Sequence, residues 1–444
     1  MEPETPATDA PILVTGATGF AGGHLALRLR RDGHKVRALV RDGAKVDHLK
    51  AAGVELAQGD LRRAADVDRA VAGCAKVYHI AAVYRTASHP DSYYQDVNVG
   101  GTVNVLEAAQ KHGVERTIHC STIGVHGDVQ EFPCTETSPF NPGDIYQETK
   151  LAGEMKAQEA FKAGLPGVVF RPAGMYGPGD LRFLKLFKSV NNGRFVMFGS
   201  GETFYHLVYA DDLIDGILLC GTHPAALGGT FIIAGDRWVS LNDWVGEIAK
   251  ALDVPPPKLR LPFWTLSAGS ALCETLCKPF GIEPPLHHRR ASFFIKSRAF
   301  STERARTVLG YAPKVPLEEG IRRTAAWHRT ATSPGAGPPD ARASIPPSIG
   351  PLKKSFWASP YEISRCRSES RWRDRPPASR AGGERSLRSL PATPPGTRAA
   401  PCGRARRGRR GCRRHRAGCR SGRDPGGRRR DPRRPGDRGW PRPS

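Results

Sequence analysis

Short apolar runs alternate with amphipathic stretches along the first 175 residues of the chain. The runs have the length and the β-branched content of buried strands, and the stretches between them carry apolar residues at helical spacing. The predicted strands are Ile12–Thr15, Val36–Val40, Val54–Leu56, Val77–Ala81, Thr117–Ser121 and Gly167–Arg171. The predicted helices are His24–Arg31, Asp66–Ala72, Val99–His112 and Tyr146–Ala163. Such alternation predicts an α/β fold with a parallel sheet that helices cover on both faces.

The pattern changes twice farther along the chain. From residue 176 the strand–helix rhythm loosens, which predicts a smaller substrate-binding lobe over residues 176–332, partly interleaved with the sheet. After Thr332 the sequence turns to Pro, Gly, Arg and Ser with almost no apolar periodicity. A segment of this kind cannot bury enough apolar surface to fold, so residues 333–444 are expected to be a disordered basic tail.

The net charge of +24 is typical of a nucleic-acid-binding protein, but it is unevenly distributed. Residues 333–444 contain 29 Lys and Arg against 8 Asp and Glu, and so carry +21 of it. The remaining 332 residues are close to neutral, as in an ordinary globular domain. Three explanations of the tail stay open: an over-extended or frame-shifted reading frame, a solvated segment, or a nucleic-acid-binding arm, which we rank last.

The cysteines and the apolar segments bear on the compartment and on metal binding. Ten scattered cysteines without a secretory signal before them favour a reducing, cytoplasmic location, and no apolar run is long enough to span a membrane. The apolar stretch Phe263–Cys277 is expected to be a buried helix, with contact to a membrane surface as the alternative. Cys273 and Cys277 precede His287 and His288, but zinc needs three or four organised ligands, so we expect no metal site.

A glycine-rich turn directly follows the first predicted strand and leads into the first predicted helix. Backbone N–H groups at a helix N-terminus carry partial positive charge, and glycines let a pyrophosphate approach them closely. Together with the alternation that follows, the turn predicts a Rossmann-type, doubly wound NAD(P)-binding domain over residues 11–175. The residues of the turn expected to contact the dinucleotide are Gly16, Thr18, Gly19, Phe20, Ala21 and Gly22.

The residue after the second strand bears on the choice between NAD and NADP. NAD sites usually place an acidic residue there for the ribose 2′-hydroxyl, whereas this chain has Arg41. A guanidinium can pair with the 2′-phosphate of NADP, so NADP is the expected cofactor. NAD stays possible because Asp42 is only one position later. Asp60 and Leu61, which follow the third strand, are expected near the adenine, and Asp60 can also cap a helix.

One tyrosine has a lysine four residues later: Tyr146 and Lys150 in "YQETK" share one face of a predicted helix. A phenol titrates too high for proton transfer at neutral pH unless a nearby positive charge favours its phenolate form. Ser121 and Thr122 end the preceding strand, where either hydroxyl could bond the substrate oxygen or serve as a cap. These four residues are the expected catalytic group.

Seven motifs occur in the order found in the extended short-chain dehydrogenase/reductases. They are "TGATGFAGGHL", "GDL", "HIAA", "NVGGTVNVLEAA", "STIGVHG", "YQETK" and "RPAGMYGPGD", and the resemblance covers about residues 11–330. That group includes NAD-dependent epimerase/dehydratases, 3β-hydroxysteroid dehydrogenases and dihydroflavonol reductases. The resemblance implies that Tyr146 is the acid/base, that Lys150 binds the nicotinamide ribose, and that Thr122 fits the family's hydroxyl better than Ser121.

The resemblance also implies further cofactor contacts. Ala81 and Ala82 would lie against the cofactor ribose, Asn98 would begin the next helix near the site, and Pro172 to Met175 would flank the nicotinamide. His126 stands where the family commonly has tyrosine, which is expected to alter packing rather than chemistry.

The sequence therefore predicts an NAD(P)-dependent oxidoreductase or epimerase that acts on a secondary alcohol or ketone by Tyr–Lys-assisted hydride transfer. The substrate is expected to be a small molecule of the sterol-like, flavonoid-like or sugar type, and the protein a homodimer. Apolar segments such as "LPFWTL" favour a hydrophobic substrate, although they could equally be core. The alternative is a redox-inactive dinucleotide-binding regulator whose basic tail engages nucleic acid.

Overall fold

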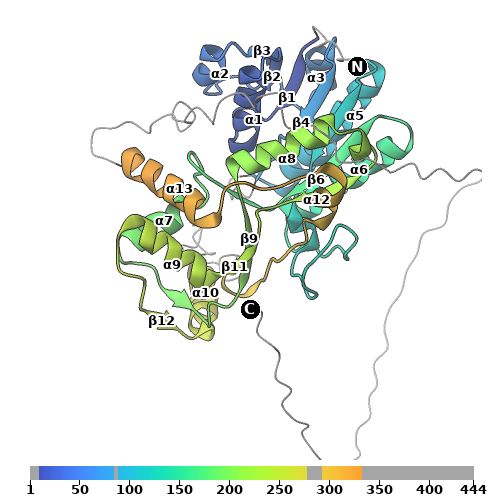
Figure 1. Ribbon diagram of the computed structural model, residues 1–444. Helices are drawn as coiled ribbons and strands as arrows, with labels where there is room; N and C mark the ends of the chain where they lie inside the picture. Colours follow the sequence, from blue (N-terminus) through green and yellow to red (C-terminus); the bar gives the residue numbers. More distant parts are fainter. Residues whose placement is uncertain (1–9, 85–88, 278–292, 333–444) are drawn as a thin grey trace, which may run out of the picture. The chain divides into compact units, whose positions relative to one another are not determined.

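The computed structural model describes residues 10–84, 89–277 and 293–332, and every structural statement below refers to them (Figure 1). The predictions for residues 333–444 and for His287 and His288 lie outside the described residues. Within them, a parallel sheet has the strand order β10-β6-β5-β4-β1-β2-β3. Its strands are β1 (Ile12–Thr15), β2 (Val36–Val40), β3 (Glu55–Gln58), β4 (Lys76–His79), β5 (Arg116–Cys120), β6 (Gly167–Pro172) and β10 (Thr230–Ile233).

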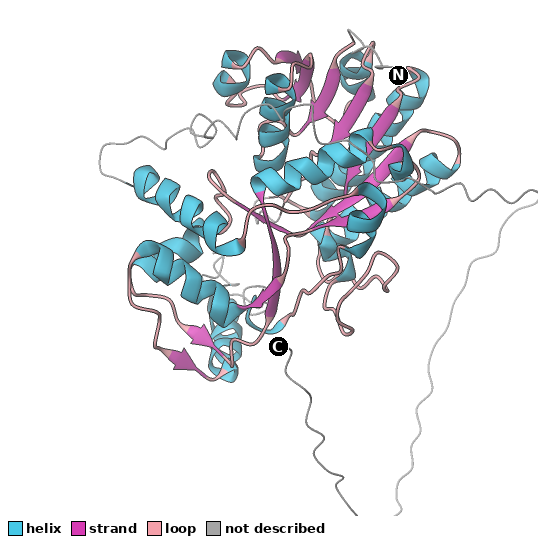
Figure 2. Cartoon of the chain, viewed as in Figure 1, coloured by secondary structure: helices cyan, strands magenta, loops and turns pink. Residues whose placement is uncertain are grey.

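Helices cover both faces of this sheet, which confirms the predicted Rossmann-type fold (Figure 2). The first strand supplies both cores, since successive side chains of a strand point to opposite faces. Ile12 and Val14 pack in the core beneath α1 (Phe20–Arg31) and α8 (Ala210–Thr222). Leu13 packs in the other core, with α3 (Ala64–Val71), α5 (Gly101–Lys111) and α6 (Ile145–Lys162).

The strand order reverses beside β1, which pairs with β2 on one side and with β4 on the other. Ligands of open α/β sheets bind at the carboxyl ends of the strands where this reversal occurs. The glycine turn after β1 and the segment Ile80–Ala82 after β4 therefore meet at the point where a dinucleotide is expected.

In two places helical structure begins earlier than the sequence analysis predicts, although the second predicted helix itself begins at Gly101 rather than Val99. α1 begins at Phe20 rather than His24, so Gly22 and Gly23 lie inside its first turns. The segment expected to start a helix at Val99 is preceded by α4 (Asp91–Tyr94) and a π-helical stretch, Gln95–Gly100, before α5. In both places glycine signals a helix boundary by local propensity, but packing against neighbouring elements keeps the chain helical.

A third core lies in the later part of the chain. Trp244 and Ile248 of α9 (Leu241–Leu252) pack there with Phe187 of α7 (Leu184–Asn191) and Ile321 of α13 (Leu317–Thr332). The strands of this part are β7 (Gly174–Tyr176), β9 (Phe204–Tyr209) and β11 (Trp238–Ser240), with the short pair β8 (Met197–Phe198) and β12 (Arg260–Leu261). β10 and α12 (Glu303–Leu309) return to the first sheet and its core.

The apolar segment expected to be helical forms α10 (Phe263–Cys277). Neither this helix nor any other helix among the described residues combines the length and apolar character needed to cross a bilayer. The described residues also contain no cluster of three or more His, Cys, Asp and Glu side chains that could hold a metal ion.

Candidate active site

The glycine turn between β1 and α1 packs so closely that side chains have no room. Gly16 has a φ of +74°, and a Cβ there would lie 2.8 Å from the Cα of Ala81. A Cβ on Gly22 would lie 2.6 Å from the carbonyl carbon of Gly16, below any normal contact. The two glycines therefore let the turn fold over the end of β4 and let α1 pack on the turn.

The first turn of α1 is built to receive an anion. Its N-cap is Gly19, which has no side chain to bond the helix N–H groups, and the turn contains no acidic residue. The first N–H groups of a helix have no partner within the helix and carry its positive dipole end. Phe20, Ala21 and Gly22 supply these groups, so the turn fits a pyrophosphate.

The acidic residues near the adenosine end are engaged by other groups. Asp42 accepts hydrogen bonds from the Gly43 N–H and from Gln58 Nε2, both at 3.0 Å. Asp60 is gripped by Arg62, whose Nη2 lies 2.7 Å from Asp60 Oδ2, and this bond holds the pKa of the Asp60 carboxyl below its usual value. Each of these carboxylates thus already accepts hydrogen bonds from protein donors.

Arg41, by contrast, is exposed, and its Nη1 donates to the hydroxyl of Tyr93 on α4 at 3.1 Å. The Arg62 guanidinium lies over the same tyrosine ring, 5.0 Å from its centroid. Two guanidiniums thus gather around Tyr93 at the adenosine end. Leu61 lies alongside, and its carbonyl accepts from Asn104 Nδ2 of α5.

Tyr146 and Lys150 lie on the same helix, α6, and differ in exposure. Asp144 caps this helix by accepting from the Gln147 N–H at 3.0 Å, which fixes where the tyrosine enters the site. Tyr146 is half-buried, and its ring meets the edge of the Tyr84 ring at a centroid distance of 5.0 Å. Lys150 is fully buried, and its Nζ donates to the carbonyl oxygen of Cys120 at 2.5 Å.

Burial lowers the pKa of the Lys150 ammonium, because desolvation disfavours its charged form. The Cys120 carbonyl at the end of β5 anchors this side chain under the first turns of α6. The structure therefore brings the lysine to the strand end that carries Ser121 and Thr122.

Ser121 and Thr122, of which the family resemblance favours Thr122, have different surroundings. The Ser121 hydroxyl is buried and donates to Glu154 Oε2. Thr122 is half-buried, and its Oγ1 accepts from the Gly124 N–H at 3.1 Å as the cap of the short helix Ile123–His126. A hydroxyl that caps through its oxygen still has its own proton to donate. Thr122 is thus the better placed of the two for a ligand.

Glu154 belongs to a buried ion pair that the sequence analysis did not identify. Its carboxylate contacts Arg171 of β6 at 2.5 Å, and both side chains are essentially inaccessible, at 0% and 1% exposure. Arg171 also donates to His126 Nε2 at 3.0 Å, and His126 Nδ1 faces the Pro139 carbonyl at 3.1 Å. His126 is therefore a neutral acceptor in a polar network, and its role is more than packing.

A second buried network lies beneath the segment after β4. Thr15 Oγ1 accepts from the N–H groups of Ile80 and Ala81 and lies 2.9 Å from His79 Nδ1. His79 Nε2 lies 3.0 Å from Thr102 Oγ1, and burial lowers the pKa of His79 to about 3. The imidazole is therefore neutral, and it fixes the backbone that would support the cofactor ribose. Ala82 follows in the same segment.

Asn98 holds the far end of this segment. Its Oδ1 accepts from the Val83 N–H at 2.8 Å, and its Nδ2 donates to Thr149 Oγ1 of α6 at 3.0 Å. The side chain is 2% exposed, so Asn98 supports the site from behind. The motifs "HIAA" and "NVGGT" contain His79, Asn98 and Thr102, and the bond between His79 and Thr102 joins the two motifs across 23 positions of the sequence.

Pro172 and Met175 lie where β6 leads into β7. Pro172 is buried, whereas Met175 is half-buried and its carbonyl accepts from Arg182 Nη2 at 2.5 Å. The Arg182 guanidinium also lies over the Phe20 ring, 5.5 Å from its centroid. Arg182, which the sequence analysis did not identify, thus links the end of β7 to the first turn of α1.

Comparison with known proteins decides the family. Residues 12–234 match the NAD dependent epimerase/dehydratase family. The chain belongs to this family. It is 31% identical over 327 residues to a 2-alkyl-3-oxoalkanoate reductase of Stenotrophomonas maltophilia, covering 71% of this chain and 98% of that protein. It is 29% identical over 342 residues to the decarboxylating sterol-4-alpha-carboxylate 3-dehydrogenase erg26 of Schizosaccharomyces pombe, covering 72% and 97%.

A solved structure, that of gox2253, superposes with a TM-score of 0.62 at 29% identity, over 72% of this chain and 98% of that one. Membership confirms the resemblance to the extended short-chain dehydrogenase/reductases. The family member described here is an NAD(P)-dependent dehydrogenase, reductase or epimerase with a nicotinamide dinucleotide as cofactor. The alternative of a redox-inactive regulator has no support from these relatives.

Proposed function

We propose that the protein interconverts a secondary alcohol and a ketone, with Tyr146 transferring the proton. The observation that carries this proposal is the placement of Lys150, which is buried on the helix of Tyr146 and bonded to the carbonyl that precedes Ser121 and Thr122. Among the described residues the bonded partner of this buried ammonium is a carbonyl, so its positive charge favours a negative charge developing nearby.

Each residue has a distinct part in the proposed reaction. A bound nicotinamide supplies the hydride acceptor or donor. Tyr146 accepts the hydroxyl proton during oxidation and returns it to the carbonyl oxygen during reduction. The Lys150 ammonium stabilises the phenolate form of Tyr146, which is present before oxidation and remains after reduction. The Thr122 hydroxyl donates to the substrate oxygen, while Ser121 stays bonded to Glu154 and supports the strand end.

The cofactor preferred under this proposal is NADP. Its 2′-phosphate is stabilised by a nearby cation and destabilised by a nearby carboxylate. The end of β2 offers the exposed guanidinium of Arg41. The carboxylates of Asp42 and Asp60 accept hydrogen bonds from Gly43 and from Arg62. NAD would bind with the same pyrophosphate contacts but without this pairing. The predicted contacts of Gly16, Ala81 and Met175 apply to either cofactor.

The substrate class follows from what the two named relatives share. Their names describe substrates in which a carboxylate-bearing carbon adjoins the carbon that carries the alcohol or ketone. Both substrates also carry an apolar body. We therefore propose a β-hydroxy or β-oxo carboxylic acid with a hydrophobic portion, which narrows the sterol-like option of the sequence analysis.

The test replaces the proton donor without disturbing the fold. Tyr146→Phe removes one oxygen from a half-buried ring, so turnover should fall on the order of 10²-fold or more. NADP binding, measured by fluorescence titration, should stay within a few-fold. The matched control is Tyr84→Phe, because its ring contacts that of Tyr146 but is assigned no proton transfer. Full activity of Tyr146→Phe would refute the proposed mechanism.

A further inference from the structure

A lysine from late in the chain lies at the start of the proposed catalytic helix. Lys296 Nζ is 3.6 Å from the position that a Cβ would occupy on Gly143. Gly143 directly precedes Asp144, the N-cap of α6, and Tyr146 is the second residue of that helix. The Lys296 ammonium thus lies beside Gly143, which precedes Tyr146 by three residues, or less than one helical turn.

This lysine is half-buried and has no acidic partner among the described residues. Lys111, Lys156 and Lys314 each form an ion pair with a carboxylate at 2.7–2.9 Å. Within residues 10–84, 89–277 and 293–332, no carboxylate lies within 4.0 Å of Lys296 Nζ. Because partly burying a charge without a partner costs free energy, a bound anion would stabilise Lys296.

Two further sources of positive charge lie beside it. Arg298 Nη1 donates to the Lys296 carbonyl at 3.0 Å, and its guanidinium lies over the Tyr205 ring, 5.5 Å from the centroid. In the part of the chain that the structure covers, Arg298 forms no ion pair either. The N-terminus of α6 adds the positive end of an 18-residue helix dipole, which the Asp144 carboxylate offsets in part.

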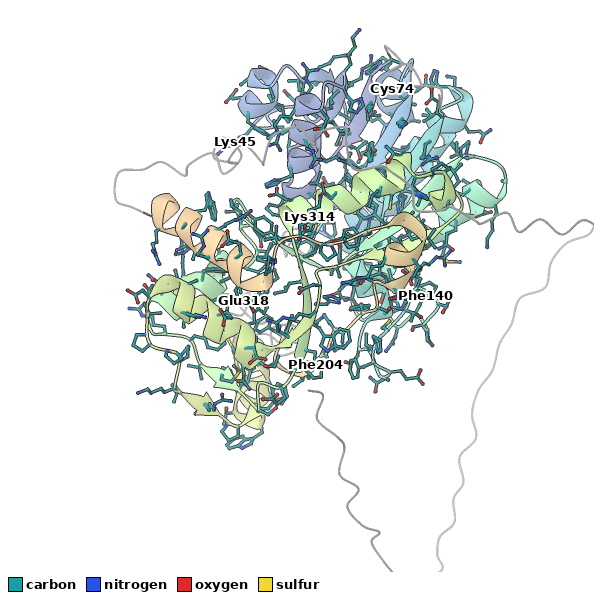
Figure 3. The ribbon with its side chains drawn as sticks, in the orientation of Figure 1. Lys45, Cys74, Phe140, Phe204, Lys314 and Glu318 are labelled. Atoms are coloured by element: carbon teal, nitrogen blue, oxygen red, sulfur yellow. The ribbon has the colours of Figure 1, made fainter. Side chains whose placement is uncertain are left out.

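Exposed aromatic surface adjoins this cationic segment. The Arg298 N–H donates to the carbonyl of Phe204, the first residue of β9 and labelled in Figure 3. Phe204 meets the ring of Phe132 at a centroid distance of 6.2 Å, and Phe132 is 48% exposed. Phe300 bridges to Cys134 in the loop that leads to α6. A cation next to exposed phenyl rings suits a ligand with an anionic head and an apolar body.

We propose that Lys296 binds the substrate's carboxylate, so that the reacting carbon is held at Tyr146. The inference rests on the proposed function and adds the group that recognises the acid. During oxidation the carbinol carbon gives up its hydride to the nicotinamide and its hydroxyl proton to Tyr146, and a ketone forms. The carboxylate is unchanged and serves only as the handle that Lys296 holds.

The experiment compares an acid with its uncharged ester in the full-length protein. The substrates are 3-hydroxydecanoate and methyl 3-hydroxydecanoate, oxidised with NADP or NAD and followed by nicotinamide absorbance. Lys296→Met should lower kcat/KM for the acid by about 10- to 100-fold, as expected for loss of a charge-assisted hydrogen bond, and leave the ester within about 2-fold. Lys296→Arg should retain the preference for the acid.

The control variant is Lys258→Met, an exposed lysine before β12 that should leave both substrates unaffected. Equal losses for acid and ester in Lys296→Met, or no loss for either, would overturn the role of Lys296. If the wild-type protein oxidises neither compound, the proposed function fails separately, and calorimetric binding of 3-hydroxydecanoate decides the inference. Binding that is lost in Lys296→Met and kept in Lys258→Met supports it, whereas equal or absent binding overturns it.

Discussion

The buried pair of Glu154 and Arg171 offers a demanding test of the structure. The two side chains are 0% and 1% exposed, so either charge left alone would be almost completely desolvated. Removing one partner of a buried ion pair typically costs about 3–5 kcal/mol, because the other charge stays buried without compensation. We expect Glu154→Gln and Arg171→Met each to reduce the free energy of unfolding by about this amount.

The double variant distinguishes the pair from two independent residues. With both charges removed, no uncompensated ion remains, so Glu154→Gln/Arg171→Met should be about as stable as the less damaged single variant. The double variant should not regain wild-type stability, because His126 Nε2 loses the donor that Arg171 supplied. The Ser121 hydroxyl keeps an acceptor, the amide oxygen that Glu154→Gln introduces. The coupling energy should accordingly equal the loss of the more damaged single variant, about 3–5 kcal/mol.

The assay is urea unfolding of the wild type, the two single variants and the double variant, followed by circular dichroism. A matched surface control is Lys156→Met, which breaks an exposed ion pair with Glu159 and should change stability by less than about 1 kcal/mol. Additive losses in the double variant, or single losses as small as the control's, would refute the reasoning from burial.

Four further predictions concern the cofactor, acid stability, the glycine turn and the tail. Arg41→Asp should shift the relative binding free energy from NADP toward NAD by about 1–3 kcal/mol, because an aspartate repels the 2′-phosphate with which Arg41 would pair. If titration of the unmutated protein shows tighter binding of NAD than of NADP, the proposed preference for NADP is wrong. Burial lowers the pKa of His79 to about 3, so below pH 6.5 the unfolded chain binds a proton at this position that the folded chain does not. The contribution of His79 to stability should be complete above pH 6.5 and fall by about 2 kcal/mol at pH 5. Burial also lowers the pKa of His119 and His206, so His79→Gln should remove only the His79 part of the acid dependence measured in melts. Gly22→Ala forces its Cβ against the Gly16 carbonyl and should weaken dinucleotide binding measured by calorimetry, whereas Gly33→Ala, whose site is open, should spare binding although its φ of +90° costs some stability. Truncation after Thr332 should leave melting temperature and turnover unchanged, since the tail has too few apolar positions to offset the entropy of ordering; a large drop in melting temperature would mean that it docks on the rest of the chain.

The order of elements and the location of the cofactor loop were predictable from local signals. Period-2 and period-3.6 patterns reflect which side chains a strand or helix must bury, so β1, β2 and β6 were found to within a residue of their ends. The glycine spacing after β1 was equally informative, because a turn that must approach a neighbouring backbone excludes Cβ atoms at particular positions. Tyr146 and Lys150 share a helix face for the same local reason.

Contacts between residues far apart in sequence were not predictable in this way. The strand patterns do not reveal that Thr230–Ile233 returns to pair with β6, since pairing depends on which edge is open once the sheet has formed. Glu154 has no distinctive neighbours in sequence, and only the pairing of β5 with β6 and the packing of α6 bring it to Ser121 and Arg171.

The sequence by itself thus determined the α/β fold, the dinucleotide turn and the Tyr–Lys pair, because each depends on spacing within a single element or turn. The tertiary structure alone gave the physical difference between Ser121 and Thr122, since burial beside Glu154 commits one hydroxyl while the other stays half-buried. It alone placed Lys296 beside α6, 146 positions after Lys150 in the chain. Burial, charge pairing and the approach of distant segments are properties of the packed chain, and local sequence carries no record of them.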